Sequence, residues 1–406
     1  MHAVLVFTFL GSVLGLFYAY VGYPILIAML ARVLGRDDPP TVSDRADDLP
    51  EITVLIAAHN AANHLTERIE NIFACDYPPE RLHVLIASDG STDATPRLVS
   101  GFNDVRVKAL SFQTRRGKAA TLVSAVQSVT SPVIIFTDAT TRFDRDSLQR
   151  LSRHFSDSAV GVVAGRVTMV DGQGGPSESL YWKLENKIRG FEARLGITLG
   201  ASGAIYAIRR SMFVAPSRPT INDDLVLPML VRMTHQCRLV FDPTARAYSP
   251  STGGIRCEFL RRQRIGLGAM QCLPTLRALL RWKNLDQAAA FASHKLIRWF
   301  GPFLLIAALV SNLILATEPR FQGLLLLQAF AYGAAAYGLV TSRRSLASRL
   351  ARAGTSFVVM NAAIGVGICR YMIGHDTVIW NPTERSSWSH IPATSEMVQA
   401  SEKRAA

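Results

Sequence analysis

Three acidic positions in this chain have side chains and surroundings suited to chemistry on a nucleotide or a metal ion. Asp89 and Asp138 each end a short apolar stretch, and the pair Asp223 and Asp224 follows Asn222. In an open α/β sheet, side chains at the carboxyl ends of the strands converge on one crevice. Carboxylates gathered there can hold a nucleotide, a metal ion and a reacting proton. The sequence therefore predicts an enzyme in which these positions share one pocket.

The adjacent acids Asp223 and Asp224 suit a general base, because neighbouring carboxylates repel and one of them then holds its proton more tightly. The alternative is an N-terminal helix cap favoured by the helix dipole, which is the commoner explanation for such a pair taken alone. Asp138 could bind Mg²⁺ together with substrate phosphates, or it could simply begin a helix. The order and co-occurrence of these positions favour the catalytic interpretation.

The segment Asp89-Gly90-Ser91-Thr92-Asp93 ends the second predicted strand. Gly90 allows the backbone to turn tightly beside Asp89, for which we favour contact with a nucleotide. For Asp93 we favour capping of the helix that follows.

The elements that must position these acids alternate along the central part of the chain. Short β-rich runs are predicted at residues 52–58, 82–88, 105–110, 133–137 and 160–170. Helical stretches lie between the first four runs, at residues 63–74, 93–100 and 117–129. This alternation predicts βαβ units and a largely parallel sheet.

Four stretches contain no Asp, Glu, Lys or Arg: residues 1–31, 299–317, 321–342 and 353–369. Because a helix needs about 20 apolar residues to cross the hydrocarbon core, the first three are long enough. The fourth could span the membrane, lie in its interface or re-enter it. The first lacks the basic start and cleavage site of a secretion signal, so we expect an uncleaved anchor.

The net charge of +13 over 406 residues is explained by the flanks of the apolar stretches, where basic residues gather. The positive-inside rule places the central block in the cytoplasm, and part of the basic excess would lie against anionic lipid. No basic stripe interleaved with aromatic residues is present, which argues against a nucleic-acid partner. The five cysteines form no C-x-x-C motif, so neither a zinc site nor a disulfide framework is predicted.

Arg261 and Arg264 share one face of a predicted helix, with Arg262 between them and Glu258 nearby. Guanidinium groups can clamp a diphosphate in a bidentate manner. A solvated or lipid-facing basic face is an equally good explanation. Lys118, before the third predicted helix, could also meet a phosphate.

Taken in order, these features resemble the membrane-bound family 2 glycosyltransferases, which include cellulose-synthase-like and hyaluronan-synthase-like enzymes. The resemblance extends from the first apolar stretch to residues 380–385, nearly the whole chain. It rests on six motifs taken together, at residues 88–93, 117–119, 137–140, 200–207, 222–224 and 261–264.

The resemblance implies a fold of the GT-A type, which is an α/β, Rossmann-like domain with a mostly parallel sheet. Here that domain would be cytoplasmic, with transmembrane and interfacial helices at both ends. It implies six segments: a transmembrane anchor (1–36), a linker (37–50), the GT-A domain (51–255), interfacial amphipathic helices (256–298), C-terminal transmembrane helices (299–375) and a tail (376–406). The protein would be integral to the plasma (inner) membrane.

The activity implied is inverting, metal-assisted transfer of a sugar from a nucleotide sugar, usually a UDP-sugar. Asp224 matches the catalytic base, with Asp223 beside it. Asp138 stands where the family binds its metal, which would be Mg²⁺ or Mn²⁺. The expected contacts to the nucleotide sugar are Asp89, Asn60, Lys118, Asp138, Arg261 and Arg264, and those to the acceptor are Gly203 and Ala204.

Three departures from the family pattern bear on the type of transfer. The metal motif reads Asp-Ala-Thr, so Thr140 replaces its second acid, and the acid pair reads Asp-Asp in place of the commoner Glu-Asp. Ile265 replaces a Trp after Arg264, which removes a stacking platform for the end of a polymer. This last change argues against a processive polymerase.

The leading hypothesis is transfer to a membrane-associated glycan or lipid-linked acceptor in exopolysaccharide or surface-glycan synthesis. Expected partners are the donor, that acceptor, membrane lipids and other subunits of a polysaccharide-synthesis machinery. One alternative is a glycolipid-forming enzyme that adds one sugar to a simple lipid. The other is a non-catalytic, nucleotide-binding scaffold of a synthase complex.

Overall fold

The computed structural model describes residues 1–36, 49–170, 180–218, 220–251, 254–281, 285–341, 343, 345–375 and 377–379. The chain forms two compact units. One unit comprises Met1–Leu26, Gly253–Met270 and Leu279–Asp376. The other comprises Ile27–Thr252, Gln271–Ala278 and Thr377–Ala406, and it carries the sheet.

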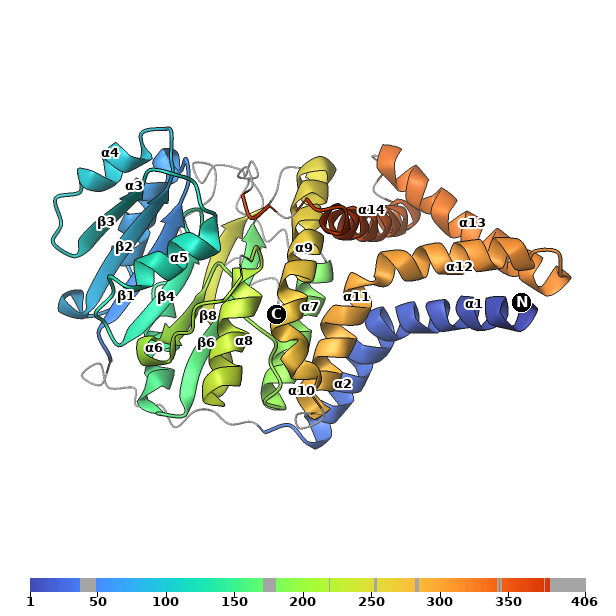
Figure 1. The fold of residues 1–406 in the computed structure, drawn as a ribbon, viewed down its shortest axis with the longest axis horizontal. Helices are drawn as coiled ribbons and strands as arrows, with labels where there is room; N and C mark the ends of the chain where they lie inside the picture. The colour runs from blue at the N-terminus through green and yellow to red at the C-terminus, as the bar shows by residue number, and fades with distance from the viewer. Residues whose placement is uncertain are drawn as a thin grey trace. The chain divides into compact units, whose positions relative to one another are not determined.

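Within the described residues, eight strands form one sheet in the order β3-β2-β1-β4-β7-β6-β8-β5 (Figure 1). Their bounds are β1 Ile52–Ala58, β2 Leu82–Asp89, β3 Val107–Phe112, β4 Val133–Asp138, β5 Arg142–Phe143, β6 Val160–Val170, β7 Tyr206–Arg209 and β8 Arg238–Pro250. Strands β3, β2, β1 and β4 run parallel, as do β6 and β8, while β7 is antiparallel to β4 and β6. Strand β5 pairs antiparallel with β8. The predicted α/β fold with a mostly parallel sheet is confirmed.

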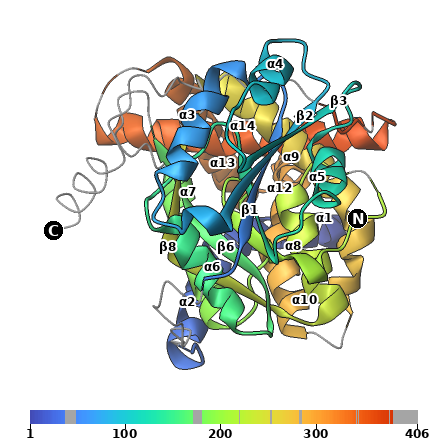
Figure 2. The same ribbon diagram turned by 90° about the vertical axis from the view of Figure 1, so that its left-hand side faces the viewer.

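The helices of this unit are α3 Ala62–Phe73, α4 Thr95–Ser100, α5 Lys118–Val126, α6 Ser147–Ser152, α7 Leu180–Arg194 and α8 Asp223–His235. Helices α3 and α5 flank β1 and β2 on opposite faces (Figure 1 and Figure 2). Both follow a strand that ends in the same direction, so their first turns lie at the carboxyl edge of the sheet.

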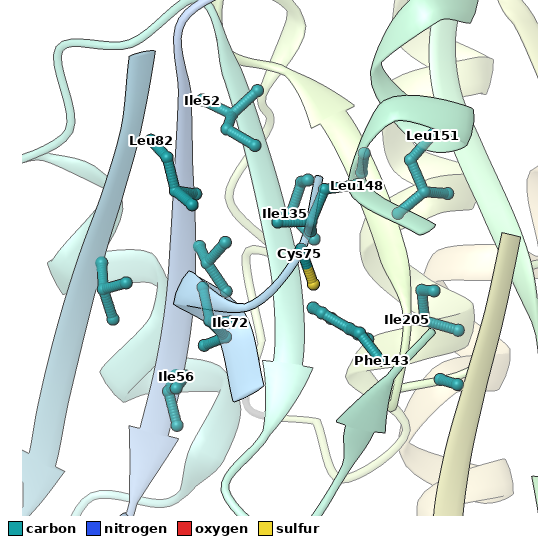
Figure 3. Close-up of a cluster of buried hydrophobic side chains, with 14 of the residues drawn as sticks. Ile52, Ile56, Ile72, Cys75, Leu82, Ile135, Phe143, Leu148, Leu151 and Ile205 are labelled. Atoms are coloured by element: carbon teal, nitrogen blue, oxygen red, sulfur yellow. The ribbon is translucent and has the colours of Figure 1, made fainter. Parts of the chain in front are cut away.

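Alternation along β1 builds the core on the α3 face. Ile52, Val54 and Ile56 are buried there, and they join one apolar cluster with Leu65 and Ile72 of α3 (Figure 3). The strand is buried on both faces, as expected for a parallel sheet covered by helices.

The register of the parallel strands brings the acidic strand ends together. Ala58, the last residue of β1, pairs with Ser88 of β2, and Ala57 pairs with Asp138 of β4. Asp89 and Asp138 therefore leave the sheet at the same edge, two strands apart.

The other unit is helical. It contains α1 His2–Phe17, a π-helical segment Tyr18–Gly22, the start of α2 Tyr23–Val33, most of α9 Gly254–Leu276, α10 Leu285–Phe291, a second π-helical segment Ala292–Leu296, α11 Ile297–Trp299, α12 Gly301–Leu315, α13 Pro319–Val340 and α14 Leu346–Met372. Among the described residues, three helices are long and apolar enough to cross a membrane: His2–Val33, Pro319–Val340 and Leu346–Met372. Large apolar side chains such as Phe7 and Leu326 are exposed on them.

Two of the four apolar stretches differ in detail from the prediction. The stretch at residues 353–369 belongs to α14, which is 27 residues long and reaches spanning length. The stretch at residues 299–317 is interrupted, because the chain bends by 60° between Trp299 and Gly301. Pro302 follows at the first turn of α12, where its missing N–H leaves no donor unsatisfied. Residues 285–315 thus form a fourth candidate span only as a bent pair.

Candidate active site

Four charged side chains from three elements meet at the carboxyl edge of the sheet. Lys118 opens α5, Asp138 ends β4, and Asp223 and Asp224 open α8. The Lys118 Nζ lies 2.8 Å from Asp138 Oδ1 and 3.5 Å from Asp223 Oδ2. Lys118 and Asp138 are 20 positions apart, and Asp223 lies 85 positions beyond Asp138. The fold therefore brings together acids that the sequence could only place at separate strand and helix ends.

Asp224 is held beside this group by the small-residue turn before β7. The Gly203 N–H donates to Asp224 Oδ2 at 3.1 Å. A Cβ at Gly203 would lie 3.0 Å from Lys118 Nζ and 3.7 Å from Asp224 Oδ2. The absence of a side chain at Gly203 thus leaves room for the Lys118 ammonium. The Asp224 side chain is half-buried. Ala204 is buried, and its carbonyl accepts a hydrogen bond from the Thr137 hydroxyl at 2.7 Å.

Asp89 is buried and organises the loop that carries Lys118. Its Oδ1 accepts the Arg116 N–H at 2.8 Å, and its Oδ2 accepts the Gly117 N–H at 2.9 Å. Gly117 has φ of +89°, a conformation that a side chain would strain. The loop thus enters α5 with Lys118 aimed at the acids. Each carboxylate oxygen can accept a second hydrogen bond, and the predicted nucleotide contact of Asp89 stays a prediction.

Asn60, beyond the end of β1, has the positive φ of +48° that Asn tolerates better than most residues. Its Oδ1 accepts the Thr92 N–H at 2.8 Å, and its own N–H donates to the Ser91 hydroxyl. Asp93 Oδ1 accepts the Thr95 N–H at 2.9 Å, at the start of α4. Asn60 and its neighbours therefore tie two loops together, and the Asn60 side chain remains exposed.

The charges of the cluster shift one another's proton affinities. Burial opposes the charge of Lys118, but Asp138 and Asp223 outweigh it and raise the pKa of this ammonium above its usual range. Burial raises the pKa of Asp223 to about 6; Lys118 opposes this shift, and Asp224 and Asp138 add to it. Near neutral pH, Lys118 is therefore charged, and Asp223 holds a proton more readily than an ordinary exposed aspartate does.

Two buried polar side chains lie near the cluster, one on a helix and one on a strand, and neither was predicted. Arg68 of α3 is 2% exposed, and its Nη2 donates to the Thr137 hydroxyl at 3.0 Å. Burial lowers the pKa of Arg68 to about 9. The signal in the sequence was a basic residue between Leu65 and Ile69 on the apolar face of α3, where a purely structural helix would have an apolar side chain.

The second buried side chain is Tyr206 of β7, which stacks on Phe136 with ring centroids 4.8 Å apart. Burial raises the pKa of Tyr206 well above its usual value, and the negative charges of Asp223, Asp224 and Asp138 add to this shift. Its hydroxyl has no hydrogen-bond partner among the described residues. No local pattern distinguishes this tyrosine from an ordinary strand aromatic.

The carboxylates of the cluster suit a hard cation whose coordination shell is completed by a bound ligand. Within the described part of the chain, no three His, Cys, Asp or Glu side chains group closely enough to hold a metal ion. Mg²⁺ in nucleotide enzymes commonly takes one or two carboxylates, with phosphates and waters as the remaining ligands. Asp138 offers such a carboxylate, since its side chain is 28% exposed at the mouth of the cluster.

Arg261 and Arg264 lie on α9 within the helical unit. Arg261 makes a bidentate ion pair with Glu258 through Nε at 2.9 Å and Nη2 at 3.0 Å, and Arg262 Nε donates to the same carboxylate at 2.8 Å. Burial opposes the ionised carboxylate, but the two guanidinium groups outweigh it and lower the pKa of Glu258 to about 2. Arg261 thus already holds an internal anion. The contact of Arg261 and Arg264 with a diphosphate stays a prediction. The motif at residues 380–385 lies outside the described residues.

Residues 53–214 match the model of glycosyl transferase family 2. A poly-β-1,6-N-acetyl-D-glucosamine synthase of Staphylococcus aureus is 28% identical over 121 residues, which are 29% of this chain and 29% of that protein. An N-acetylglucosaminyltransferase of Rhizobium sp. is 24% identical over 190 residues, which are 44% of this chain and 42% of that protein. The match therefore spans less than half the length of either relative.

Among solved structures, a mannosyltransferase from Pyrobaculum calidifontis, in complex with GDP-Man and Mn²⁺, has a TM-score of 0.64 at 20% identity. The alignment covers 89% of this chain and 98% of that one. At this identity the likeness shows the fold, which is of the GT-A type predicted from the sequence.

Proposed function

Residues 53–214 are a family 2 glycosyltransferase domain, and from that premise we propose that this chain transfers the sugar of a UDP-sugar, with inversion, to a membrane-associated acceptor. The observation that carries the proposal is the convergence of Asp138, Asp223 and Asp224 around the Lys118 ammonium at one edge of the sheet. A site for this reaction needs an ionised base and cationic support for a leaving diphosphate.

In this proposal Asp224 is the general base. It is the more exposed acid of the pair, and its Oδ2 is fixed by the Gly203 N–H. Asp223 is buried against Lys118 and has the raised pKa, so it holds a proton more readily than an exposed carboxyl would. Asp224 takes the proton of the acceptor hydroxyl while that oxygen bonds to the sugar carbon and the bond to the nucleoside diphosphate breaks.

Lys118 stabilises the negative charge that develops on the departing diphosphate. Asp138 would hold Mg²⁺ or Mn²⁺ together with the phosphates, and that ion would supply further charge stabilisation. Asp89 acts by holding the loop that aims Lys118, and it offers free lone pairs to the nucleotide.

The names of the relatives suggest the first donor to test. Both the synthase from Staphylococcus aureus and the enzyme from Rhizobium sp. are named for N-acetylglucosamine. We therefore propose UDP-N-acetylglucosamine as the leading donor.

The acceptor proposed is a membrane-associated glycan or lipid-linked sugar, because three described helices have the length and apolarity to cross a bilayer. Transfer of one sugar to a simple lipid is the second candidate. It is favoured by Ile265, an aliphatic residue where the family resemblance leads one to expect the stacking Trp of a polymerase.

The test is a donor panel with the full chain in detergent. Labelled nucleotide sugars are supplied with membrane lipid extract, with Mg²⁺, with Mn²⁺ or with a chelator, and the products are separated by mass. Turnover of UDP-N-acetylglucosamine in preference to other donors supports the proposal, and one added sugar on an extractable lipid favours the second candidate. The proposal is wrong if no nucleotide sugar is transferred or hydrolysed under any condition.

A further inference from the structure

The Lys118 side chain occupies the place where a cation would be expected between the carboxylates. Its Nζ contacts Asp138 Oδ1 at 2.8 Å and lies 3.5 Å from Asp223 Oδ2, and only 16% of the side chain is exposed. The Cβ position of Gly203 is 3.0 Å from the same nitrogen. The ammonium is thus enclosed by groups from α5, β4, α8 and the turn before β7.

The fold determines this placement, because hydrogen bonds and backbone conformation both fix the loop before Lys118. The backbone N–H groups of Arg116 and Gly117 are held by the buried Asp89 carboxylate. Gly117 also adopts a φ that favours glycine, so the chain enters α5 in one direction. A flexible surface lysine would have no such support.

Asp138 is the acid that we assign to the divalent cation, and it is already in direct contact with the ammonium. Two cations bound to one carboxylate repel each other, and that repulsion is strong where little water screens it. A divalent ion that approaches Asp138 in the absence of nucleotide must therefore displace Lys118 or share its anion. A diphosphate brings the additional negative charge that lets both cations stay.

We propose that Lys118 fills the metal-binding position of the nucleotide-free enzyme, and thereby makes the binding of a divalent cation depend on a nucleoside diphosphate. This inference rests on the proposed function in one respect, which is the assignment of Asp138 as the protein's metal ligand. Because coupling between two ligands is reciprocal, the metal must raise the affinity for the nucleotide by the same factor.

The test measures free Mn²⁺ by electron paramagnetic resonance during titration of the chelator-treated full chain in detergent. In the wild type we expect Mn²⁺ affinity to rise roughly 10- to 100-fold when UDP is added, the usual size of such coupling. In the Lys118→Met variant without UDP, we expect Mn²⁺ to bind at least about tenfold more tightly than to the wild type, since Asp138 and Asp223 lose their internal cation.

The control is Lys108→Met, which removes an exposed lysine of β3 and should leave Mn²⁺ binding unchanged. Lys118→Gln is the second variant, should the methionine variant fold poorly. In either Lys118 variant, Mn²⁺ without nucleotide should also raise the unfolding temperature, which it should not do in the wild type.

The inference is overturned if wild-type protein that binds UDP takes up Mn²⁺ equally well with and without it, or if loss of Lys118 leaves nucleotide-free Mn²⁺ binding unchanged. It is also overturned if Asp138→Asn retains wild-type Mn²⁺ binding in the presence of UDP. Failure of the proposed function gives another pattern, in which UDP does not bind under any condition. The nucleotide-free comparison of Lys118→Met with the wild type then still decides the role of Lys118.

Discussion

The Asp223 carboxyl shows how one buried residue links the site to the stability of the fold. Its side chain is 5% exposed, and it shares the Lys118 ammonium with Asp138. Burial places its pKa at about 6 against an ordinary value of 3.8. The folded protein therefore binds a proton here more tightly than the unfolded chain does.

That difference predicts a pH dependence of stability. Between about pH 4 and pH 6 the native state carries more protons at this position than the unfolded state, so the contribution of this carboxyl to the free energy of unfolding falls as pH rises through this window. Asp223→Asn removes this titration. As pH rises from 4.5 to 7.5, we therefore expect the unfolding free energy of the variant to gain roughly 2 kcal/mol relative to that of the wild type. Urea unfolding at pH 4.5 and pH 7.5 measures this. The exposed Asp76, changed to Asn, serves as control, and an equal pH response in all three proteins would contradict the prediction.

Substitution of Gly203 should lower the rate of sugar transfer without lowering the stability of the fold. An added methyl group would meet the Lys118 Nζ at 3.0 Å, which is the far end of a flexible side chain that can shift. We expect Gly203→Ala to lower the rate of sugar transfer by at least about tenfold, because 1.4 kcal/mol of lost positioning is enough.

The unfolding free energy of Gly203→Ala should stay within about 1 kcal/mol of the wild type, since the atom nearest to the added methyl group is the end of a side chain that can shift. Gly190→Ala, where a Cβ meets nothing within 4 Å, is the matched control and should keep full activity. Parallel loss of activity and stability in Gly203→Ala would show that the turn is structural only.

The loop between β2 and α4 and the loop between β3 and α5 depend on each other. Gly90 has a φ of +59°, and a Cβ there would lie 2.6 Å from the Arg115 nitrogen. The added Cβ would clash with backbone atoms, so neither loop can shift to relieve the clash without moving Asp89 or Lys118. The two loops therefore act as one support for the ammonium.

Gly90→Ala should consequently lower both stability and donor binding. The positive φ and the backbone clash together predict a loss of roughly 2 kcal/mol or more of unfolding free energy. Thermal unfolding and calorimetric titration of UDP in Mn²⁺ measure the two effects. A variant with unchanged stability and UDP affinity would mean that these loops are not coupled as the structure indicates.

The chain as a whole combines a region that matches glycosyl transferase family 2 with helices suited to a bilayer. The helices His2–Val33, Pro319–Val340 and Leu346–Met372 expose large apolar side chains along their length. We expect the protein to remain in the membrane fraction after alkaline carbonate, which strips peripheral proteins. Release into the soluble fraction would contradict membrane insertion, and a peripheral protein of the same cells provides the control.

Much of this arrangement could be predicted, because the apolar runs of β1, β2 and β4 are short, buried on both faces and bounded by turn residues. Their acidic ends had to meet at one edge once the strands ran parallel. The short strand β5 and the strand β8, which contains Pro243, lack such runs and owe their structure to pairing with neighbours. They were not predicted.

The sequence also could not predict which residues the charged side chains contact. Lys118 was expected to meet a phosphate, and in the structure it is paired with Asp138 and Asp223. Arg68 lies beneath the cluster through contacts with Thr137 and Phe143, which are about 70 residues away in sequence. Such pairings depend on how the helices pack on the sheet, and local sequence patterns do not predict them.

The most direct test of the central claim is a comparison of binding and turnover in Asp224→Asn. We expect this variant to bind UDP in Mn²⁺ as tightly as the wild type, because Lys118, Asp138 and Asp223 are intact. Turnover of UDP-N-acetylglucosamine, or of whichever donor the panel identifies, should fall by about 100-fold or more, the usual effect of losing a general base. Unchanged turnover in a variant that binds UDP normally would contradict the assignment of this acid cluster as the site of sugar transfer.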